Sequence, residues 1–333
     1  MSSRVTMRDV AREVGVSSMT VSRALREDKT VSTKTRTRVR EVADRLGYVY
    51  DTTAQAFRTQ KSGFVAITLP SINNANFAET FRALSNALEG GGLQILLGAT
   101  NYRIEREEIL VRQLLTRNPE ALVMTGGHHS QTTRDLVQAR GIPVVEMWDL
   151  PTSPLGHVVG FSNAGAMKSI IAHLAESGRR KLAFVGASEG GDLRGAERRA
   201  GAVAAAEKLQ LPPMDFLDAG TAPVSMRHGA KLAAKMGHAL LDYDGLVCVS
   251  DPVAFGILSE CNRLGIKVPD QLAISGFGHF EVAAISQPRI TTVDVSAHEI
   301  GETAAQMLGA IFSGETTPYV VEVETSILRG GTT

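Results

Sequence analysis

The stretch at residues 7–26, MRDVAREVGVSSMTVSRALR, restricts the fold of this chain more than any other. Its first apolar side chains recur at helical spacing, at Met7, Val10, Ala11 and Val14. Gly15 then supplies the permissive backbone that a helix end needs, and Ser17 can cap a second helix that buries Val21 and Leu25. A single helix with an interior glycine is the alternative, since Gly costs only about 1 kcal/mol against Ala there. The spacing favours two short helices joined by a tight turn.

A third helix is predicted directly after this pair. Ser32 is a candidate N-cap, and Gly47 follows the last apolar residue of the run. The apolar positions between them are Val39, Val42, Ala43 and Leu46. Residues 1–48 are therefore expected to form a small all-α domain with the helix-turn-helix arrangement.

Charge is divided unevenly between this head and the rest of the chain. The whole chain balances at 35 basic and 35 acidic residues, yet residues 1–61 hold 13 Lys and Arg against 7 Asp and Glu, and the remainder holds 22 against 28. Because phosphate neutralisation needs clustered cations, a basic head on an acidic body indicates a nucleic-acid reader. A solvated helical cap with scattered arginines is the alternative.

The run TMRDVAREVGVSSMTVSRAL, followed by VSTKTRTRV and LGYVY, resembles the head of the lactose/galactose repressor (LacI/GalR) family of bacterial transcription factors. The resemblance covers nearly all 333 residues. It implies that the second helix enters the major groove and that Ser18, Met19 and Arg23 lie at base edges. It also implies phosphate or cap contacts by Thr6, Ser17, Thr20 and Ser22. The guanidinium of Arg23 can bond both acceptors of a guanine, whereas Met19 offers only apolar contact.

Residues 49–61 are expected to be a linker with one possible helical turn, since they hold too few apolar side chains to fold alone. The resemblance implies a hinge helix that forms on operator DNA, pairs with its dimer mate and pushes an apolar side chain into the minor groove. Phe57 stands where the family usually has Leu, and Tyr50 where it usually has Pro. Phe also unstacks base steps in such wedges. The alternative for Phe57 is packing against the body.

Composition limits the compartment and the chemistry of the chain. No run of 18 apolar residues predicts a membrane span, and the polar N-terminus lacks the apolar core of a secretion signal, so we expect a cytoplasmic protein without membrane contact. Cys248 and Cys261 show no metal-ligand spacing and are expected to be reduced, packed thiols. Neither a metal nor a cofactor is predicted.

From residue 62 onward, short β-rich runs alternate with helical patterns, which is typical of a parallel sheet with crossover helices. Strands are predicted for FVAITLP, LQILLGA, ALVMTG, PVVEM and HVVGF in a first lobe and for KLAFVG, MDFLDA, GLVCVS and LAISGF in a second. After Ile290 we expect a strand and a helix, and VVEVETSI is predicted as one final strand. Residues 62–333 are thus expected to form two doubly wound lobes, with a ligand cleft at the carboxyl ends of their strands.

This body resembles the periplasmic-binding-protein-like (type I) sensor domain of the same family, through the runs SINNANFAE, RGAERRAG, SDPVAFGIL and PRITTVD. Within the family, VVEMWDLP and ISGFGHFE resemble the repressors of gluconate utilisation. The resemblance implies an effector-binding and dimerisation domain and a sugar-acid effector, either gluconate or a phosphorylated or keto derivative. It also implies control of gluconate uptake and catabolism genes.

A sugar-acid pocket needs a fixed cation for the carboxylate, polar groups for the hydroxyls and an apolar wall. Arg198, at the arginine by which the family contacts its ligand, is the candidate clamp. The other candidate effector-binding residues are Phe77, Glu146, Trp148, Asn163, Ser250, Asp251 and His279. The family commonly has Asp after the aromatic of its G-F-D motif, but here Gly278 and His279 follow. A loop cap or an ion pair between lobes is the alternative for each residue.

Three functions compete on these observations. GASEG at residues 186–190 matches the G-x-S-x-G pattern of serine hydrolases, but GGDLRG continues as a loop where a helix should begin. A transport-type binding protein would need a signal peptide and no head. A ligand-gated repressor explains the head, the linker and the cleft together, and a chain ending at SILRGGTT without a leucine heptad is expected to be a homodimer that reads a pseudo-palindrome. The operator, the exact acid and the sign of its effect stay open, as does a different sugar or metabolite as the effector.

Overall fold

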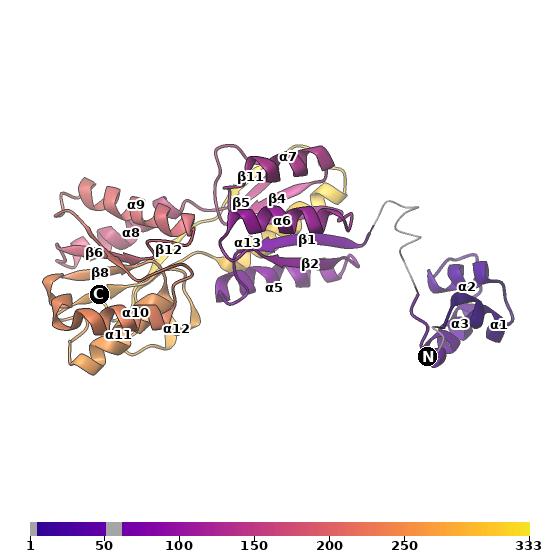
Figure 1. Cartoon of the computed structure of the whole chain (residues 1–333), viewed down its shortest axis with the longest axis horizontal. Helices are drawn as coiled ribbons and strands as arrows, with labels where there is room; N and C mark the ends of the chain where they lie inside the picture. The colour runs from indigo at the N-terminus through magenta and orange to yellow at the C-terminus, as the bar shows by residue number, and fades with distance from the viewer. Residues whose placement is uncertain (1–4, 51–61) are drawn as a thin grey trace. The chain divides into compact units, whose positions relative to one another are not determined.

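The computed structural model describes residues 5–50 and 62–333 and divides the chain into two compact units, Met1–Ser62 and Gly63–Thr333. We call them the head and the body (Figure 1).

The described part of the head is a helical bundle around a small apolar core. Its helices are α1 (Met7–Val14), α2 (Ser18–Leu25) and α3 (Thr33–Leu46). α1 ends at Gly15 in the left-handed conformation (φ 78°), and the Ser17 hydroxyl accepts a hydrogen bond from the Thr20 amide at 3.1 Å. Val10, Val21 and Val39, one from each helix, are completely buried together. These helices and their caps are as predicted from the apolar spacing.

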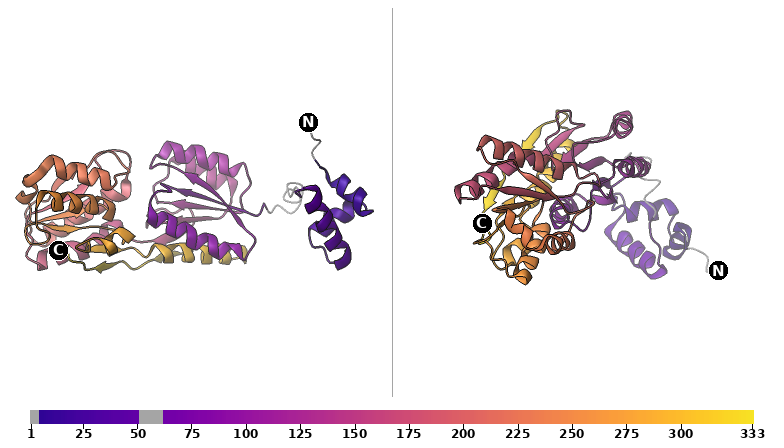
Figure 2. Two further views of the ribbon diagram at one scale, coloured as in Figure 1. Left: turned by 90° about the horizontal axis from the view of Figure 1, so that it is seen from below. Right: turned by 60° about the vertical axis from the view of Figure 1, so that its left-hand side comes forward.

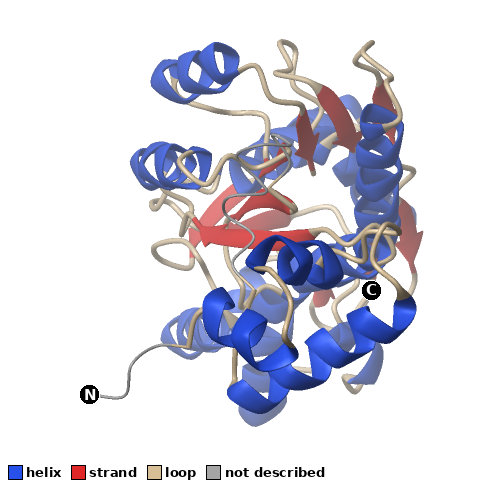
Figure 3. Ribbon diagram, turned by 90° about the vertical axis from the view of Figure 1, so that its right-hand side faces the viewer, coloured by secondary structure: helices blue, strands red, loops and turns tan. Residues whose placement is uncertain are grey.

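The first lobe of the body is a parallel sheet in the order β11-β5-β4-β3-β1-β2, with helices on both faces (Figure 3). Its strands are β1 (Phe64–Leu69), β2 (Gln94–Ala99), β3 (Ala121–Thr125), β4 (Val144–Met147), β5 (His157–Gly160) and β11 (Val320–Glu322). Its helices are α5 (Ala75–Glu89), α6 (Ile104–Leu115), α7 (Gln131–Arg140) and α13 (Ala297–Phe312). Side chains of β1 alternate between two cores, since Val65 and Ile67 pack with α5 and α13 whereas Ala66 packs with α6 and α7.

The second lobe repeats this plan with a sheet in the order β7-β6-β8-β9, also parallel. Its strands are β6 (Leu182–Gly186), β7 (Asp215–Asp218), β8 (Gly245–Cys248) and β9 (Ala273–Ser275). Its helices are α8 (Asn163–Glu176), α9 (Leu193–Lys208), α10 (Met226–Met236), α11 (Asp251–Leu264) and the short α12 (Glu281–Ile285), with a 3-10 turn, η1 (Gly237–Asp242), after α10. Cys248 and Cys261 are free and buried in this lobe.

The connections between the lobes decide where the last segments lie. Within residues 62–333 the chain crosses between β5 and α8, returns between β10 (Thr292–Asp294) and α13, and crosses again between β11 and β12 (Ser326–Leu328), as Figure 2 shows. The prediction of one final strand in VVEVETSI is wrong. β11 pairs in parallel with β5 in the first lobe, whereas β12 pairs antiparallel with β10. Val323, between the two strands, is buried, and its amide donates to the Gly160 carbonyl at 2.8 Å.

The predicted fold class is confirmed: a small all-α helix-turn-helix head and an α/β body of two doubly wound lobes. In the described residues no helix is both long and apolar enough to cross a membrane. The same residues hold no cluster of His, Cys, Asp and Glu that could bind a metal ion.

Candidate functional site

The outer surface of α2 carries the side chains that sequence reasoning assigned to base contacts. Val21 and Ala24 turn inward to the core of the head. Met19 is 64% exposed, and Arg23 is exposed and forms no salt bridge within the described residues. Ser18, in the first turn, is half-buried. The helix therefore presents a flexible apolar side chain and a free guanidinium on its outer face.

The hydroxyls assigned to phosphate or cap contacts are engaged within the head. Thr6 caps α1, with its amide and hydroxyl donating to the Asp9 carboxylate at 3.0 and 2.6 Å, and these bonds hold the pKa of Asp9 below its usual range. Ser17 caps α2 and also lies 2.9 Å from the Thr20 hydroxyl. Ser22 Oγ lies 3.3 Å from the hydroxyl oxygen of Tyr50, which follows α3 in the chain. The assignment of Phe57 as a minor-groove wedge falls outside the described residues.

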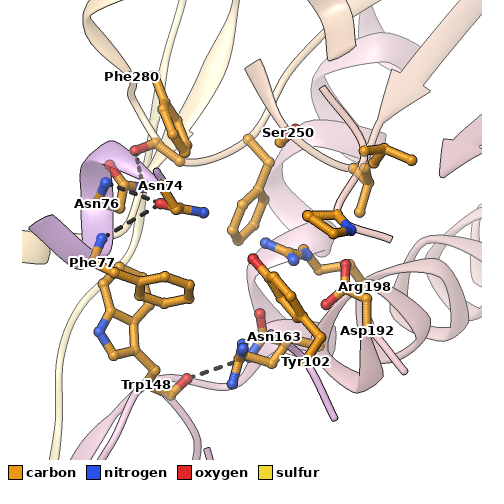
Figure 4. A pocket seen from close by; sticks show the side chains of 16 residues that line it. Asn74, Asn76, Phe77, Tyr102, Trp148, Asn163, Asp192, Arg198, Ser250 and Phe280 are labelled. Carbon is orange, nitrogen blue, oxygen red and sulfur yellow. Dashed lines mark hydrogen bonds between the residues drawn. The ribbon is translucent and has the colours of Figure 1, made fainter. Parts of the chain in front are cut away.

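A cavity of about 70 Å³ lies between the two lobes of the body, at the carboxyl ends of their strands (Figure 4). It is lined by Asn74, Asn76, Phe77, Tyr102, Trp148 and Asn163 from the first lobe and the crossover, and by Asp192, Arg194, Arg198, Pro223, Val224, Val249, Ser250, Phe277, Gly278 and Phe280 from the second. A space of this size holds several waters or part of a small metabolite. It is the position that doubly wound folds use for ligands.

Aromatic rings form one wall of this cavity. Phe77 and Trp148 meet edge to face with ring centroids 5.0 Å apart, and the contact continues from Trp148 to Phe161 at 6.0 Å. Trp148 has a left-handed backbone (φ 79°), a strained conformation for a bulky residue. Such strain persists where the surroundings fix it and is common at ligand sites.

Two arginines of α9 enter the cavity from the second lobe. The guanidinium of Arg198 stacks on Phe277 at 4.5 Å, and its Nε is buried without a hydrogen-bond partner in the described residues. Burial lowers the pKa of Arg198, while the charge of Asp192 raises it. Arg194, one turn earlier, reaches the first lobe, where its Nη1 lies 3.8 Å from the Asp149 carboxylate. Arg198 is thus the arginine whose buried Nε–H has no partner in the described residues and that lacks a carboxylate within ion-pair distance, so it can bind a ligand.

Polar groups of the first lobe and the crossover complete the site. Asn163 donates to the Asp149 carboxylate at 2.9 Å, and its Oδ1 is a buried acceptor without a partner in the described residues. Asn76 donates to the carbonyl of Gly278 across the lobes at 2.7 Å. A Cβ at Gly278 would lie 2.6 Å from the Phe280 ring, which explains a glycine at this left-handed position (φ 111°).

Five of the eight predicted effector contacts line the cavity: Phe77, Trp148, Asn163, Arg198 and Ser250. The other three do not. Glu146 lies inside β4, and it accepts the Leu155 amide at 2.6 Å. Asp251 is fully buried at the start of α11 and accepts the Phe280 amide at 2.8 Å, so it holds the loop behind the cavity. His279 turns away to Asp294, at 3.3 Å.

Sequence reasoning missed the other lining residues, although two of them carried a signal. Arg194 precedes Arg198 by four residues, which places both on one helix face. Asn74 follows the first strand and caps α5, accepting from the amides of Asn76 and Phe77. Nothing in the sequence indicated Tyr102, which reaches the cavity from the loop after β2.

The G-x-S-x-G loop does not have the geometry of a hydrolase elbow. β6 ends at Gly186, and α9 begins only at Leu193. The Ser188 amide donates to the Gly220 carbonyl and to the Asp218 carboxylate, which fixes the loop beside β7. A nucleophile elbow requires an immediate turn from strand to helix.

Comparison with known proteins identifies both parts of the chain. Residues 6–51 match the family of bacterial regulatory proteins, lacI family, and residues 171–333 match the periplasmic binding protein-like domain. The chain is 35% identical to the HTH-type transcriptional regulator GntR of Pseudomonas aeruginosa, over 94% of this chain and 90% of that protein.

Solved structures agree with this assignment. A transcriptional regulator of the LacI family from Silicibacter pomeroyi is 31% identical, covers 98% of this chain and 99% of its own, and superposes with a TM-score of 0.91. The Lac repressor dimer bound to operator and an anti-inducer shares the fold alone, at 20% identity over 98% of both chains, with a TM-score of 0.83. The chain therefore belongs to the lacI family of bacterial regulatory proteins and is a DNA-binding transcriptional regulator, not an enzyme.

Proposed function

We propose that this regulator is a homodimeric repressor that binds a pseudo-palindromic operator and is released by a small sugar acid of the gluconate type. The observation that carries the effector class is Arg198, a buried guanidinium with an unused Nε–H at the cavity between the lobes. A carboxylate is the natural partner of a fixed guanidinium, since charge-assisted hydrogen bonds are the stronger ones.

The remaining lining groups suit a polyhydroxylated chain. Asn163 Oδ1 accepts a hydroxyl proton, and Ser250 can donate or accept. The rings of Phe77 and Trp148 provide a surface for C–H groups. The 35% identity to the GntR regulator of Pseudomonas aeruginosa over 94% of this chain supports the same assignment.

The proposed release acts through the relative position of the lobes. A ligand held by Arg198 from the second lobe and by Asn163 at the crossover favours one angle between the lobes, and in our proposal this angle separates the paired segments 49–61 of the dimer. The ligand can weaken operator binding only as far as it prefers the released state. A typical coupling is about 1–3 kcal/mol, or roughly 5- to 150-fold in operator affinity.

Dimeric operator binding is proposed from the family and from the geometry of its heads. Two heads related by a two-fold axis read two half-sites of opposite orientation, so the bound sequence is a pseudo-palindrome. The fold shared with the Lac repressor dimer on its operator is in keeping with this arrangement. Light scattering of the full chain at micromolar concentration should give a dimer, and a stable monomer or tetramer would contradict the proposal.

The decisive experiment tests the effector and the clamp together. An operator is first selected from random duplexes with the full-length protein. Release is then titrated with gluconate, 6-phosphogluconate and 2-ketogluconate, and with glucose and glucitol as neutral analogues. We expect at least one acid, and neither neutral analogue, to release the wild-type protein. Arg198→Ala should bind the operator normally and ignore that acid.

Arg199→Ala is the matched control. Arg199 is the next residue of α9, but its guanidinium stacks on Phe216 at 3.8 Å, outside the cavity between the lobes. This variant should respond to the acid like the wild type. The sugar-acid proposal would be refuted if the acid released Arg198→Ala at the same concentration as the wild type, or if only neutral sugars released the wild type. The effector would then be another sugar or metabolite.

A further inference from the structure

The segment that follows α3 turns back and contacts α2. α3 ends at Gly47 (φ 66°), and the Tyr48 amide donates to the Ala43 carbonyl at 2.8 Å, which turns the chain back. Two residues later the phenol oxygen of Tyr50 lies 3.3 Å from Ser22 Oγ on α2. Both side chains are half-buried. The contact joins α2 to Tyr50, the second residue of the predicted linker and the last residue of the head that the structure describes.

This pair keeps a hydrogen-bond donor available for a ligand. A serine and a tyrosine hydroxyl carry one proton each, and their mutual hydrogen bond uses only one of them. Whichever group donates, one O–H remains. The backbone carbonyl of Ser22 accepts a hydrogen bond from Arg26 Nε at 3.0 Å.

The same bond from Arg26 places a positive charge beside the two hydroxyls. Arg26 forms no salt bridge with the carboxylates of residues 5–50 or 62–333, so its charge is not neutralised by direct contact there. Two hydroxyls and a guanidinium, gathered where α2 meets the exit segment, match a group that only accepts hydrogen bonds and carries negative charge. A DNA phosphate is such a group, and its usual partners are Arg, Ser and Tyr side chains.

We propose that Tyr50 and Ser22 together bind one phosphate of each operator half-site, with Arg26 supplying charge, and that Tyr50 is thus a further DNA contact of this regulator. The proposal rests on the DNA-binding function of the head. It also gives the contact a consequence for the linker, since a phosphate held by Tyr50 fixes where the following segment starts on the DNA.

The test uses the full-length protein and its selected operator, with affinity measured by fluorescence anisotropy. Tyr50→Phe removes one oxygen and keeps the ring, so operator affinity should fall about threefold to tenfold, as expected for one hydrogen bond. The loss should be equal for operators with altered bases. It should be clearly smaller on a duplex in which a methylphosphonate replaces the contacted phosphate, because the uncharged group has one acceptor oxygen fewer and makes only the weaker, neutral hydrogen bond.

Ser22→Ala is the second variant, and Tyr319→Phe in the body is the control. Ser22→Ala should lose affinity at the same phosphate as Tyr50→Phe, and the double variant should lose less than the product of the two factors. Tyr319→Phe should bind like the wild type. Unchanged affinity of Tyr50→Phe, or the same loss on every methylphosphonate duplex, would overturn the proposal while leaving operator binding by the wild type intact.

If Tyr50→Phe failed to fold by circular dichroism, Ser22→Ala would decide alone. A loss by Ser22→Ala that is confined to one phosphate per half-site supports the site, and a loss spread over all duplexes refutes it.

Discussion

The side chain of His129 is completely buried inside the first lobe, between two carboxylates. Its Nδ1 lies 2.8 Å from Oε1 of Glu107 in α6, and its Nε2 lies 3.4 Å from Oε1 of Glu146 in β4. Burial alone lowers the pKa of His129, but hydrogen bonds and charge from Glu107 and Glu146 outweigh it and raise the pKa to about 9. The imidazole is therefore charged at neutral pH and holds two buried carboxylates.

This shift makes the stability of the body depend on pH. Because the folded state binds the proton more tightly than the unfolded chain, whose histidine titrates near 6.5, the contribution is complete below pH 6.5 and is lost as pH rises through 9. A rise from 6.5 to about 9 corresponds to about 3 kcal/mol. About half of this should remain near pH 8 and almost none at pH 10.

Urea unfolding at pH 6.5, 8 and 9.5, followed by the fluorescence of Trp148, measures this dependence in the body. The chain has one tryptophan, so the signal reports the body and not the head. The wild type should lose roughly 2–3 kcal/mol between pH 6.5 and 9.5. His129→Gln should be strongly destabilised at pH 6.5 and should approach the wild type as pH rises.

His298→Gln is the matched control, because His298 also contacts two glutamates but is half exposed. Its loss should stay below about 1 kcal/mol, as for surface ion pairs. If the curves of wild type and His129→Gln ran parallel over this pH range, the charged imidazole would not be what stabilises the cluster.

Three further predictions concern single side chains. Arg23→Ala should cost about 1–3 kcal/mol at one base position of the operator and relax specificity there, and equal weakening across operator variants would argue against base reading. Gly256→Ala should destabilise the body by about 1–3 kcal/mol in urea unfolding, because its Cβ would lie 2.0 Å from the Met226 carbonyl, whereas Gly309→Ala, with nothing within 4 Å, should stabilise it by about 0.5–1 kcal/mol. Asp251 has its pKa raised to about 6, mainly by burial, so stability should fall as pH rises from 4 to 6, and Asp251→Asn should not show this fall.

The local structure of the head follows from the sequence because its signals act over a few residues. Apolar spacing, N-caps and left-handed glycines are interactions within one helical turn, and α1, α2 and α3 begin and end where these signals stand. The alternation of strands and helices in the body is equally visible. Parallel strands such as β3 and β8 are buried on both faces, and they therefore appear in the sequence as short, continuous apolar runs.

Glu146 and Trp148 show what the sequence could not decide. The two residues are neighbours in the chain, yet Glu146 packs against His129 on one face of the sheet while Trp148 lines the cavity. The left-handed backbone of Trp148 redirects the chain just after β4, and no local signal announces it.

The sequence by itself determined the helices of the head, the succession of strands and helices, and Arg198 as a candidate clamp. Tertiary structure alone decided which strand β11 and β12 each join, and which side chains of distant segments meet at the cavity. The physical reason is that periodicity and caps depend on neighbours in the chain. Strand partners and the walls of a cleft depend on contacts between residues such as Asn76 and Gly278, which lie 202 positions apart.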